Sequence, residues 1–295
     1  MELSAMRKTA KSADLYRHMG KIEKIVGMTI EASGPECSIG DVCRIFKKGK
    51  SSESINAEVV GFGQNKVLLM PYSDIEGIGP GSIVDSTGGK LTVNCSDALI
   101  GRIIDAIGNP LDGGEKVPNG TPYAIAGAPV NPLTRPAITQ IIPMGVKAID
   151  GLLTIGRGQR MGIFAGSGVG KSTLLGMIAK EVKADINVIA LVGERGREVK
   201  EFIDRDLGEK GMARSVLVVA TSDQPAMMRN KCPMTATAIA EYFKDQGKNV
   251  LLMMDSLTRF AMAQREIGLS IGEAPIARGY TPSIYTILPK LLERA

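Results

Sequence analysis

The sequence predicts an α/β fold in which a parallel sheet is covered by helices on both faces and is preceded by a small N-terminal β-barrel. Residues 19–87 contain short runs rich in Val and Ile that are separated by Gly, Asn and Ser, which is typical of small closed barrels. From about residue 141, apolar runs alternate with helical stretches, and this alternation indicates a parallel sheet buried on both faces. The length of 295 residues agrees with roughly two domains.

The individual elements follow this division of the chain. Within the barrel, the segment GFGQNK (61–66) is expected to join two strands as a hairpin. Residues 88–140 are rich in Gly, Pro and Asn and are expected to form a connector from the barrel to the core. In the domain over residues 141–295, the apolar pattern predicts strands at 159–165, 186–192, 214–221 and 249–255 and helices at 171–182, 197–210, 225–246 and 256–267.

The first 18 residues have a different character from the chain that follows. Apolar side chains recur there at a spacing of three or four residues, among several Arg and Lys residues. This pattern predicts a basic amphipathic N-terminal helix over residues 1–18. A frayed terminus and a docking segment for a partner helix or an anionic surface both fit the pattern.

The composition excludes several classes of function. The four cysteines are scattered and the only histidine is His18, so neither a His/Cys metal centre nor a Ser-His-Asp triad is expected. The net charge of +5 is mild and only 4% of residues are aromatic, which argues against a dedicated nucleic-acid binder. The chain has no apolar run of about 20 residues and no signal peptide, and we expect a cytoplasmic protein.

A phosphate-binding loop is the most specific motif. The segment AGSGVGKST (165–173) lies between a predicted strand and a predicted helix and follows the pattern GxxxxGK[ST], with Ala165 in place of the first glycine. Its glycines allow backbone N–H groups to close around an anion at a helix N-terminus. The side chain of Lys171 can reach the β- and γ-phosphates, and the hydroxyl of Ser172 can ligate Mg²⁺. The residues expected to bind ATP are Gly166, Ser167, Gly168, Val169, Gly170, Lys171, Ser172 and Thr173.

Two acidic residues follow predicted strands at the edge where this loop is expected. Asp255 ends the run NVLLMMD, and Glu194 follows the run INVIALV. Alone, Asp255 would be read as a helix N-cap and Glu194 as a solvated turn residue. Because ligands of open α/β sheets bind at the carboxyl ends of strands, we expect Asp255 to hold Mg²⁺ and Glu194 to act on an attacking water.

Five segments together resemble the rotary-type ATPase family that includes the ATP synthase α and β subunits. They are GRIIDAIGNPLDGG, MGVKAIDGLLTIGRGQR, AGSGVGKST, VGERGREV and MDSLTRFAMAQREIGL. Within that family, SVLVVATSDQPAMMR and the stretch after MDSLTRF are similar to the flagellum-specific export ATPases and fit the injectisome ATPases less closely. The resemblance covers nearly the whole chain and implies a RecA/ATP-synthase-like core with a phosphate loop.

The resemblance also implies roles for single residues. Glu194 of the GER motif would be the catalytic carboxylate, and the adjacent Arg195 would contact the γ-phosphate. Glu198 would lie in the Mg²⁺–water shell, beside the metal role already assigned to Asp255. Arg259 of LTRF would help to position the nucleotide. The activity implied is ATP hydrolysis that energises export of flagellar proteins through a type III secretion apparatus.

Partners are implied in the same way. Family members form ring hexamers, dock a stator-like regulatory protein through the N-terminal segment and admit a coiled-coil stalk protein. They act with export chaperone–substrate complexes at the cytoplasmic face of a membrane export gate, and no nucleic acid is expected. Members continue past YTPSIYTILPKLLERA, so the resemblance implies a C-terminally truncated chain without the helical C-terminal domain and an arginine offered across the subunit interface.

Three other functions compete with flagellar export. An injectisome ATPase would share all of these motifs. A non-hydrolysing structural subunit should lack the glutamate of the GER motif, which is present here as Glu194. A Rho-like RNA translocase would need an RNA-binding barrel, but residues 19–87 contain only three aromatic residues, Phe46, Phe62 and Tyr72, so base stacking has little support.

Overall fold

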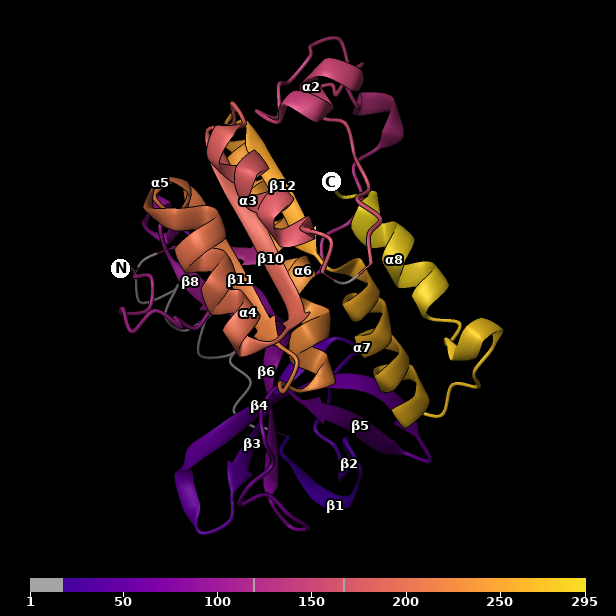
Figure 1. Ribbon diagram of the computed structural model, residues 1–295. Coiled ribbons are helices and arrows are strands. Elements are labelled where there is room, and N and C mark those ends of the chain that lie inside the picture. Colours follow the sequence, from indigo (N-terminus) through magenta and orange to yellow (C-terminus); the bar gives the residue numbers. More distant parts are fainter. Residues whose placement is uncertain (1–17, 119, 167) are drawn as a thin grey trace, which may run out of the picture. The chain divides into compact units, whose positions relative to one another are not determined.

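The computed structural model describes residues 18–118, 120–166 and 168–295, which belong to two compact units, Met1–Gly89 and Lys90–Ala295 (Figure 1). The helix predicted over residues 1–18 lies outside the described residues except for His18. Within the part of the chain that is described, no helix combines the length and the apolar character that a bilayer crossing requires.

The N-terminal unit is a closed barrel of six strands, which confirms the predicted barrel. Its interior is filled by aliphatic side chains, among them Ile30, Ile45 and Leu69, which are fully buried. At the start of β1, buried and exposed positions alternate, as the pleat predicts. In ladder order the strands are β1 (Gly20–Val26), β2 (Thr29–Ser33), β5 (Lys66–Pro71), β4 (Lys50–Gly63), β3 (Asp41–Lys47) and β6 (Ile83–Lys90).

The predicted hairpin is present between β4 and β5. Gly63 pairs with Lys66, which leaves a loop of two residues, Gln64 and Asn65. Both loop residues have positive φ angles, 48° and 61°. Two consecutive positive φ angles define the type I′ turn, whose twist matches that of the flanking strands.

The segment expected only as a connector supplies structure of its own. β7 (Thr92–Cys95) and β9 (Thr121–Ala124) form a two-stranded antiparallel sheet. β8 (Ile103–Asp105) lies parallel to β11 (Ser215–Thr221) and so belongs to the core sheet. Three ladder residues between glycines and a proline give no clear sequence signal, which explains why this strand was not predicted.

The core of the second unit is a parallel sheet with the order β12-β10-β11-β8. β10 (Ile186–Glu194) and β12 (Val250–Asp255) pair in parallel, with Leu191 opposite Asp255. Eight of the nine residues of β10 are buried, as expected of a strand covered on both faces. The predicted parallel-sheet core is therefore confirmed.

Helices cover both faces of this sheet (Figure 1). On one face, α3 (Lys171–Glu181), α4 (Gly196–Glu201), the π-helix η3 (Phe202–Leu207) and α5 (Gly208–Met212) form a core cluster with Ile189 and Leu217. On the other lie α6 (Ala226–Asp245) and α7 (Leu257–Ser270). The remaining helices are η1 (Asp97–Leu99), η2 (Pro132–Thr134), α2 (Lys147–Leu152), η4 (Ala277–Gly279) and α8 (Ile284–Leu292).

The strand predicted at 159–165 is wrong for this structure. These residues have no strand conformation, and the side chain of Phe164 is 97% exposed. A strand is stabilised by ladder hydrogen bonds to a neighbouring strand. An apolar run shows that a segment can be buried, but it does not show that such a neighbour is present. Among the described strands, β12 is an edge strand that pairs with β10 alone, and no described strand pairs with this segment.

Candidate active site

The phosphate loop precedes α3 directly, as predicted. Gly168 and Gly170 have φ angles of +78° and +92°, which side chains with a Cβ rarely adopt. Gly170 is the residue before α3, and Lys171 begins the helix. The described residues that precede α3, Ala165, Gly166 and 168–170, are exposed, while Ser167 lies outside the described residues. Backbone N–H groups at this helix start are therefore open to an anion.

Lys171 links this loop to the end of β12. Its Nζ lies 2.5 Å from Oδ1 of Asp255, the last residue of that strand. The carboxylate is buried, with 6% of its side chain exposed, whereas Lys171 is partly exposed. The ion pair thus neutralises a carboxylate that would be costly to bury alone. It also places the start of α3 at the carboxyl edge of the sheet.

A second ion pair lies at the same edge. Glu194 ends β10, and Arg259 lies in the first turn of α7. The guanidinium donates from Nε to Oε1 at 3.2 Å and from Nη2 to Oε2 at 3.3 Å. Gly193 permits this approach, because its φ angle is +68° and a Cβ there would lie 2.8 Å from Cδ of Arg259. Gly193 was not among the predicted site residues.

The surroundings of Glu194 raise the pKa of its carboxyl group. Burial is the main cause, followed by a hydrogen bond with the carboxyl group of Glu198. The negative charge of Asp255 acts in the same direction, whereas the positive charges of Arg259 and Lys171 oppose it. These influences show that the five side chains are close enough to interact, and a pKa shifted in this way is common at functional sites.

Arg195 occupies a more exposed position than the other predicted residues. Its side chain is 79% exposed, and Nη1 lies 3.5 Å from Oε1 of Glu198 on the next turn. Glu198 therefore interacts with both Arg195 and Glu194. The structure brings Lys171, Glu194, Glu198, Asp255 and Arg259 together, and it leaves Arg195 at the rim.

The donor set at this edge fits Mg²⁺. The carboxylates of Asp255 and Glu198 and the hydroxyl of Ser172, which follows Lys171, are hard oxygen ligands. The described residues contain no cluster of three or more His, Cys, Asp or Glu side chains of the kind that cages a metal. Mg²⁺ does not need such a cage, since it is usually held by one or two carboxylates together with substrate phosphates.

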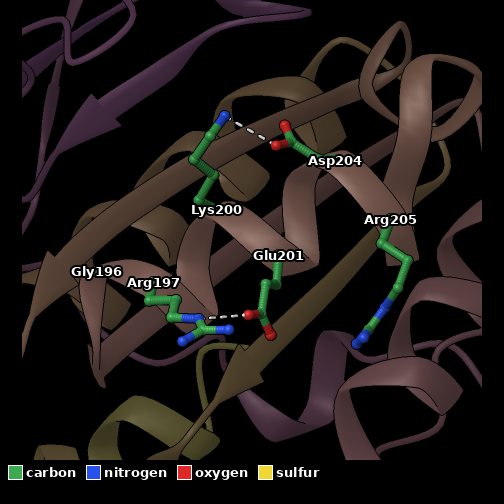
Figure 2. A pocket seen from close by; sticks show the side chains of 6 residues that line it. All are labelled: Gly196, Arg197, Lys200, Glu201, Asp204 and Arg205. Carbon is green, nitrogen blue, oxygen red and sulfur yellow. Dashed lines mark hydrogen bonds and ion pairs between the residues drawn. The ribbon is translucent and has the colours of Figure 1, made fainter.

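A separate surface hollow of about 580 Å³ lies on α4 and η3 (Figure 2). Four of its five charged side chains are paired with one another, because Arg197 lies 2.8 Å from Glu201 and Lys200 lies 2.8 Å from Asp204, and the fifth, Arg205, pairs with Asp206. None of the predicted site residues lines this hollow. The candidate site is therefore the edge formed by the ends of β10 and β12 and the start of α3.

The sequence patterns of two known domains match the chain at the places just described. The nucleotide-binding domain of the ATP synthase alpha/beta family matches residues 145–295, which include both ion pairs. The β-barrel domain of the same family matches residues 22–88. The chain belongs to the ATP synthase alpha/beta family. This confirms the family resemblance that the motifs predicted.

Relatives within the ATP synthase alpha/beta family include proteins of flagella and of secretion systems. The chain is 57% identical over 295 residues to the flagellum-specific ATP synthase of Bacillus subtilis (strain 168), covering 100% of the chain and 67% of the relative. It is 49% identical over 285 residues to the corresponding protein of Treponema pallidum (strain Nichols), covering 97% of the chain and 64% of the relative. The chain thus spans about two thirds of the length of these relatives.

A solved structure of the same family has a closely similar fold. The assembled ATPase EscN of the enteropathogenic E. coli type III secretion system matches with a TM-score of 0.86 at 48% identity, over 94% of this chain and 66% of EscN. A second structure, of EscN in complex with its central stalk EscO, matches with the same TM-score over 67% of EscN. The match supports the assignment of both the barrel and the parallel-sheet core.

Proposed function

We propose that this protein hydrolyses ATP with Mg²⁺ and that the energy drives export of flagellar proteins through a type III secretion apparatus. One observation carries the proposal. Two cations and two carboxylates from distant parts of the chain, Lys171 with Asp255 and Arg259 with Glu194, meet beside a glycine-rich loop at the carboxyl edge of a parallel sheet. This is the arrangement that phosphoryl transfer to water requires.

Binding begins at the start of α3. Backbone N–H groups at Gly168 and Gly170 and the partial positive charge of the helix N-terminus attract the phosphates of ATP. Lys171 exchanges its contact with Asp255 for the β- and γ-phosphates. Bound Mg²⁺ would supply charge neutralisation on the β- and γ-phosphate oxygens. The residues that would hold it are Ser172, Asp255 and Glu198.

Hydrolysis depends on Glu194. Its raised pKa, caused mainly by burial, makes the ionised carboxylate a stronger base than an exposed glutamate. Each of its oxygens accepts one hydrogen bond from Arg259 and retains a further lone pair. Glu194 can therefore orient a water and take its proton while Arg259 fixes the plane of the carboxylate. Arg195, at the exposed rim, would contact the γ-phosphate.

Assembly and partners belong to the same proposal. EscN is described as assembled and as bound to a central stalk, which supports a homo-oligomeric ring, here proposed as a hexamer, around a coiled-coil stalk. We propose that residues 1–18 dock a stator-like regulatory protein and that chaperone–substrate complexes are delivered to the ring. The protein would act in the cytoplasm, peripherally at the membrane export gate.

An injectisome role is the second candidate function. It is favoured by 48% identity over 279 residues to the type 3 secretion system ATPase of Xanthomonas euvesicatoria, covering 95% of this chain and 63% of that protein. The flagellar role is preferred because the relatives of flagella reach 57% identity.

The proposal is tested in two steps. Phosphate release from ATP is measured with Mg²⁺ and with Mg²⁺ chelated, and we expect turnover only with the metal. The whole protein is then expressed in a Bacillus subtilis strain that lacks its flagellum-specific ATP synthase, and in a type III secretion host that lacks its secretion ATPase. Restored motility supports flagellar export, and restored secretion alone supports the injectisome role. Absence of Mg²⁺-dependent phosphate release would contradict both.

A further inference from the structure

A π-helical segment separates α4 from α5 and turns an acidic side chain inward. Asp206 lies in η3, and only 4% of its side chain is exposed. Both carboxylate oxygens accept hydrogen bonds from Arg205, from Nε to Oδ1 at 3.1 Å and from Nη2 to Oδ2 at 3.1 Å. The charge of Asp206 is thus neutralised locally by a neighbour that reaches it from the solvent side. π-Helical turns often occur at functional sites.

The buried side of Asp206 faces α3. Thr173 Oγ1 donates to Oδ1 of Asp206 at 3.4 Å. One turn further along α3, Gly176 approaches the backbone of the same residue, because a Cβ at Gly176 would lie 2.4 Å from the carbonyl oxygen of Asp206. Residues at positions i and i+3 share one face of a helix. α3 and η3 are therefore fixed against each other at two neighbouring points.

The two residues of this contact belong to segments that carry different parts of the proposed site, the phosphate loop and the catalytic carboxylate. Thr173 lies in the first turn of α3, two residues after Lys171, and so belongs to the helix that begins directly after the phosphate loop. η3 continues directly from α4, which carries Glu198 and starts two residues after Glu194. The Thr173–Asp206 contact is thus a polar link between the segment that holds the phosphates and the segment that follows the catalytic carboxylate, beside the apolar packing that these segments share.

We propose that Asp206 is a positioning residue that sets the distance between the phosphate loop and Glu194. This inference rests on the proposed ATP hydrolysis. Arg205 already balances the charge of Asp206, so the role of this residue is geometric: it keeps α3 from sliding along η3. A shift of about 1 Å between the two halves would misplace the γ-phosphate relative to the attacking water, and such a shift can lower turnover by about a hundredfold.

The test separates geometry from folding. Binding stoichiometry and affinity for Mg-ATP are measured by calorimetry, and kcat is expressed per binding site. In Asp206→Ala we expect kcat per site to fall by about 10- to 100-fold, with affinity for Mg-ATP changed by less than about threefold, because the phosphate loop itself is unaltered. A purely structural role would lower the number of binding sites and the Tm but leave kcat per site unchanged.

A second variant approaches the same contact from α3. Thr173→Val removes the donor and keeps the shape, so kcat per site should fall as in Asp206→Ala, and Thr173→Ser should restore it. The double variant Thr173→Val/Asp206→Ala should lose no more than the more impaired single variant, since both remove one contact. The matched control is Asp204→Asn, an exposed neighbour on η3 that pairs with Lys200, which should retain wild-type kcat.

The outcomes distinguish this inference from the function on which it rests. Failure of the unaltered protein to bind Mg-ATP would contradict the proposed function itself. Binding and turnover by the unaltered protein, with kcat per site within about threefold of wild type in either variant, would overturn the positioning role alone. Multiplicative losses in the double variant would also overturn it, because the two side chains would then act independently. If Asp206→Ala does not fold, Thr173→Val decides through both of its readouts, because Thr173 is also expected to bind ATP. A lower kcat per site with affinity for Mg-ATP within about threefold of wild type supports the positioning role, and a larger loss of affinity overturns it, since Thr173 would then act on the nucleotide itself.

Discussion

Arg259 donates two hydrogen bonds to the carboxylate of Glu194, although the two residues lie 65 positions apart in the sequence. The carboxylate is positioned by the end of β10, and the guanidinium by the first turn of α7. A bidentate contact fixes the plane of a carboxylate as well as its position. Glu194 is therefore oriented before any nucleotide arrives, and this orientation makes the site sensitive to small changes around either residue.

Replacing Glu194 by Gln should abolish most turnover while keeping nucleotide binding. Glutamine preserves the shape but cannot take a proton from water, and a general base contributes about 10²–10⁴-fold to rate. Phosphate release and calorimetric Mg-ATP affinity measure the two effects. Glu201→Gln is the control, because Glu201 is a carboxylate on the adjacent α4 that pairs with Arg197. Turnover of Glu194→Gln within a few-fold of wild type would reduce Glu194 to a turn residue.

Lys171→Ala should weaken binding of Mg-ATP. It removes a charge-assisted contact to the terminal phosphates, worth about 1.5–3 kcal/mol, and it leaves the buried carboxylate of Asp255 without its cation. Calorimetry should show an affinity lowered by about 10- to 150-fold. Lys200→Ala, on the surface of α4, should bind like wild type. Unchanged affinity in Lys171→Ala would remove the phosphate-loop assignment.

The pH dependence of turnover should report on Glu194. Its pKa is raised above the ordinary value of 4.5, chiefly by burial, so the inactive protonated form persists to higher pH. Turnover should fall as pH drops through this raised pKa. Glu198→Ala removes the hydrogen-bond partner that raises the pKa of Glu194 and should move the acid limb to lower pH, whereas Arg259→Gln removes an opposing cation and should move it higher. Shifts in the opposite directions would contradict the assignment of the limb to Glu194.

Gly193→Ala should disturb both folding and catalysis. The φ angle of +68° disfavours alanine by roughly 1–2 kcal/mol, and the new methyl group would displace Arg259 from Glu194. We expect a lower unfolding midpoint in denaturant and turnover reduced by about tenfold or more. Gly196→Ala is the matched control, because a Cβ there meets nothing within 4 Å. Equal behaviour of the two variants would mean that Arg259 does not depend on Gly193.

Deleting residues 1–18 should separate docking from nucleotide binding. No proposed site residue lies in this segment, so affinity for Mg-ATP should be unchanged, whereas co-purification with the stator-like partner should be lost. A variant in which Arg7, Lys8 and Lys11 are changed to Ala keeps the length and tests the basic character alone. Retention of the partner by the shortened chain would count against a docking role.

The site residues that could be predicted are those that follow a clear apolar run or belong to a specific motif. Glu194 and Asp255 follow buried apolar runs. Lys171 belongs to a motif whose glycines allow the backbone to close around a phosphate. The general rule that parallel strands present their carboxyl ends on one edge then placed these residues together. The barrel and the parallel sheet followed from similar periodic signals.

Pairings between distant side chains were beyond the reach of such patterns. Nothing in the sequence around Thr173 points to Asp206, because a π-helix and a glycine contact create their proximity. The run at 159–165 has the composition of a strand, but no described strand pairs with it. The composition of a segment does not reveal whether a neighbouring strand is present to pair with it. The exposure of Arg195 likewise depends on how α4 leaves the strand, which its short motif does not encode.

The closed ladder of the barrel has a consequence for amide hydrogen exchange. Every barrel strand has a neighbour on each side, so barrel amides on both sides of a strand can be shielded from solvent deuterium until the ladder opens. β12 has a neighbour on one side only among the described strands. Its inward amides should exchange as slowly as those of β10, and its outward amides should be labelled within the first minutes. A deuterium time course should therefore label β12 in an alternating, every-other-residue pattern.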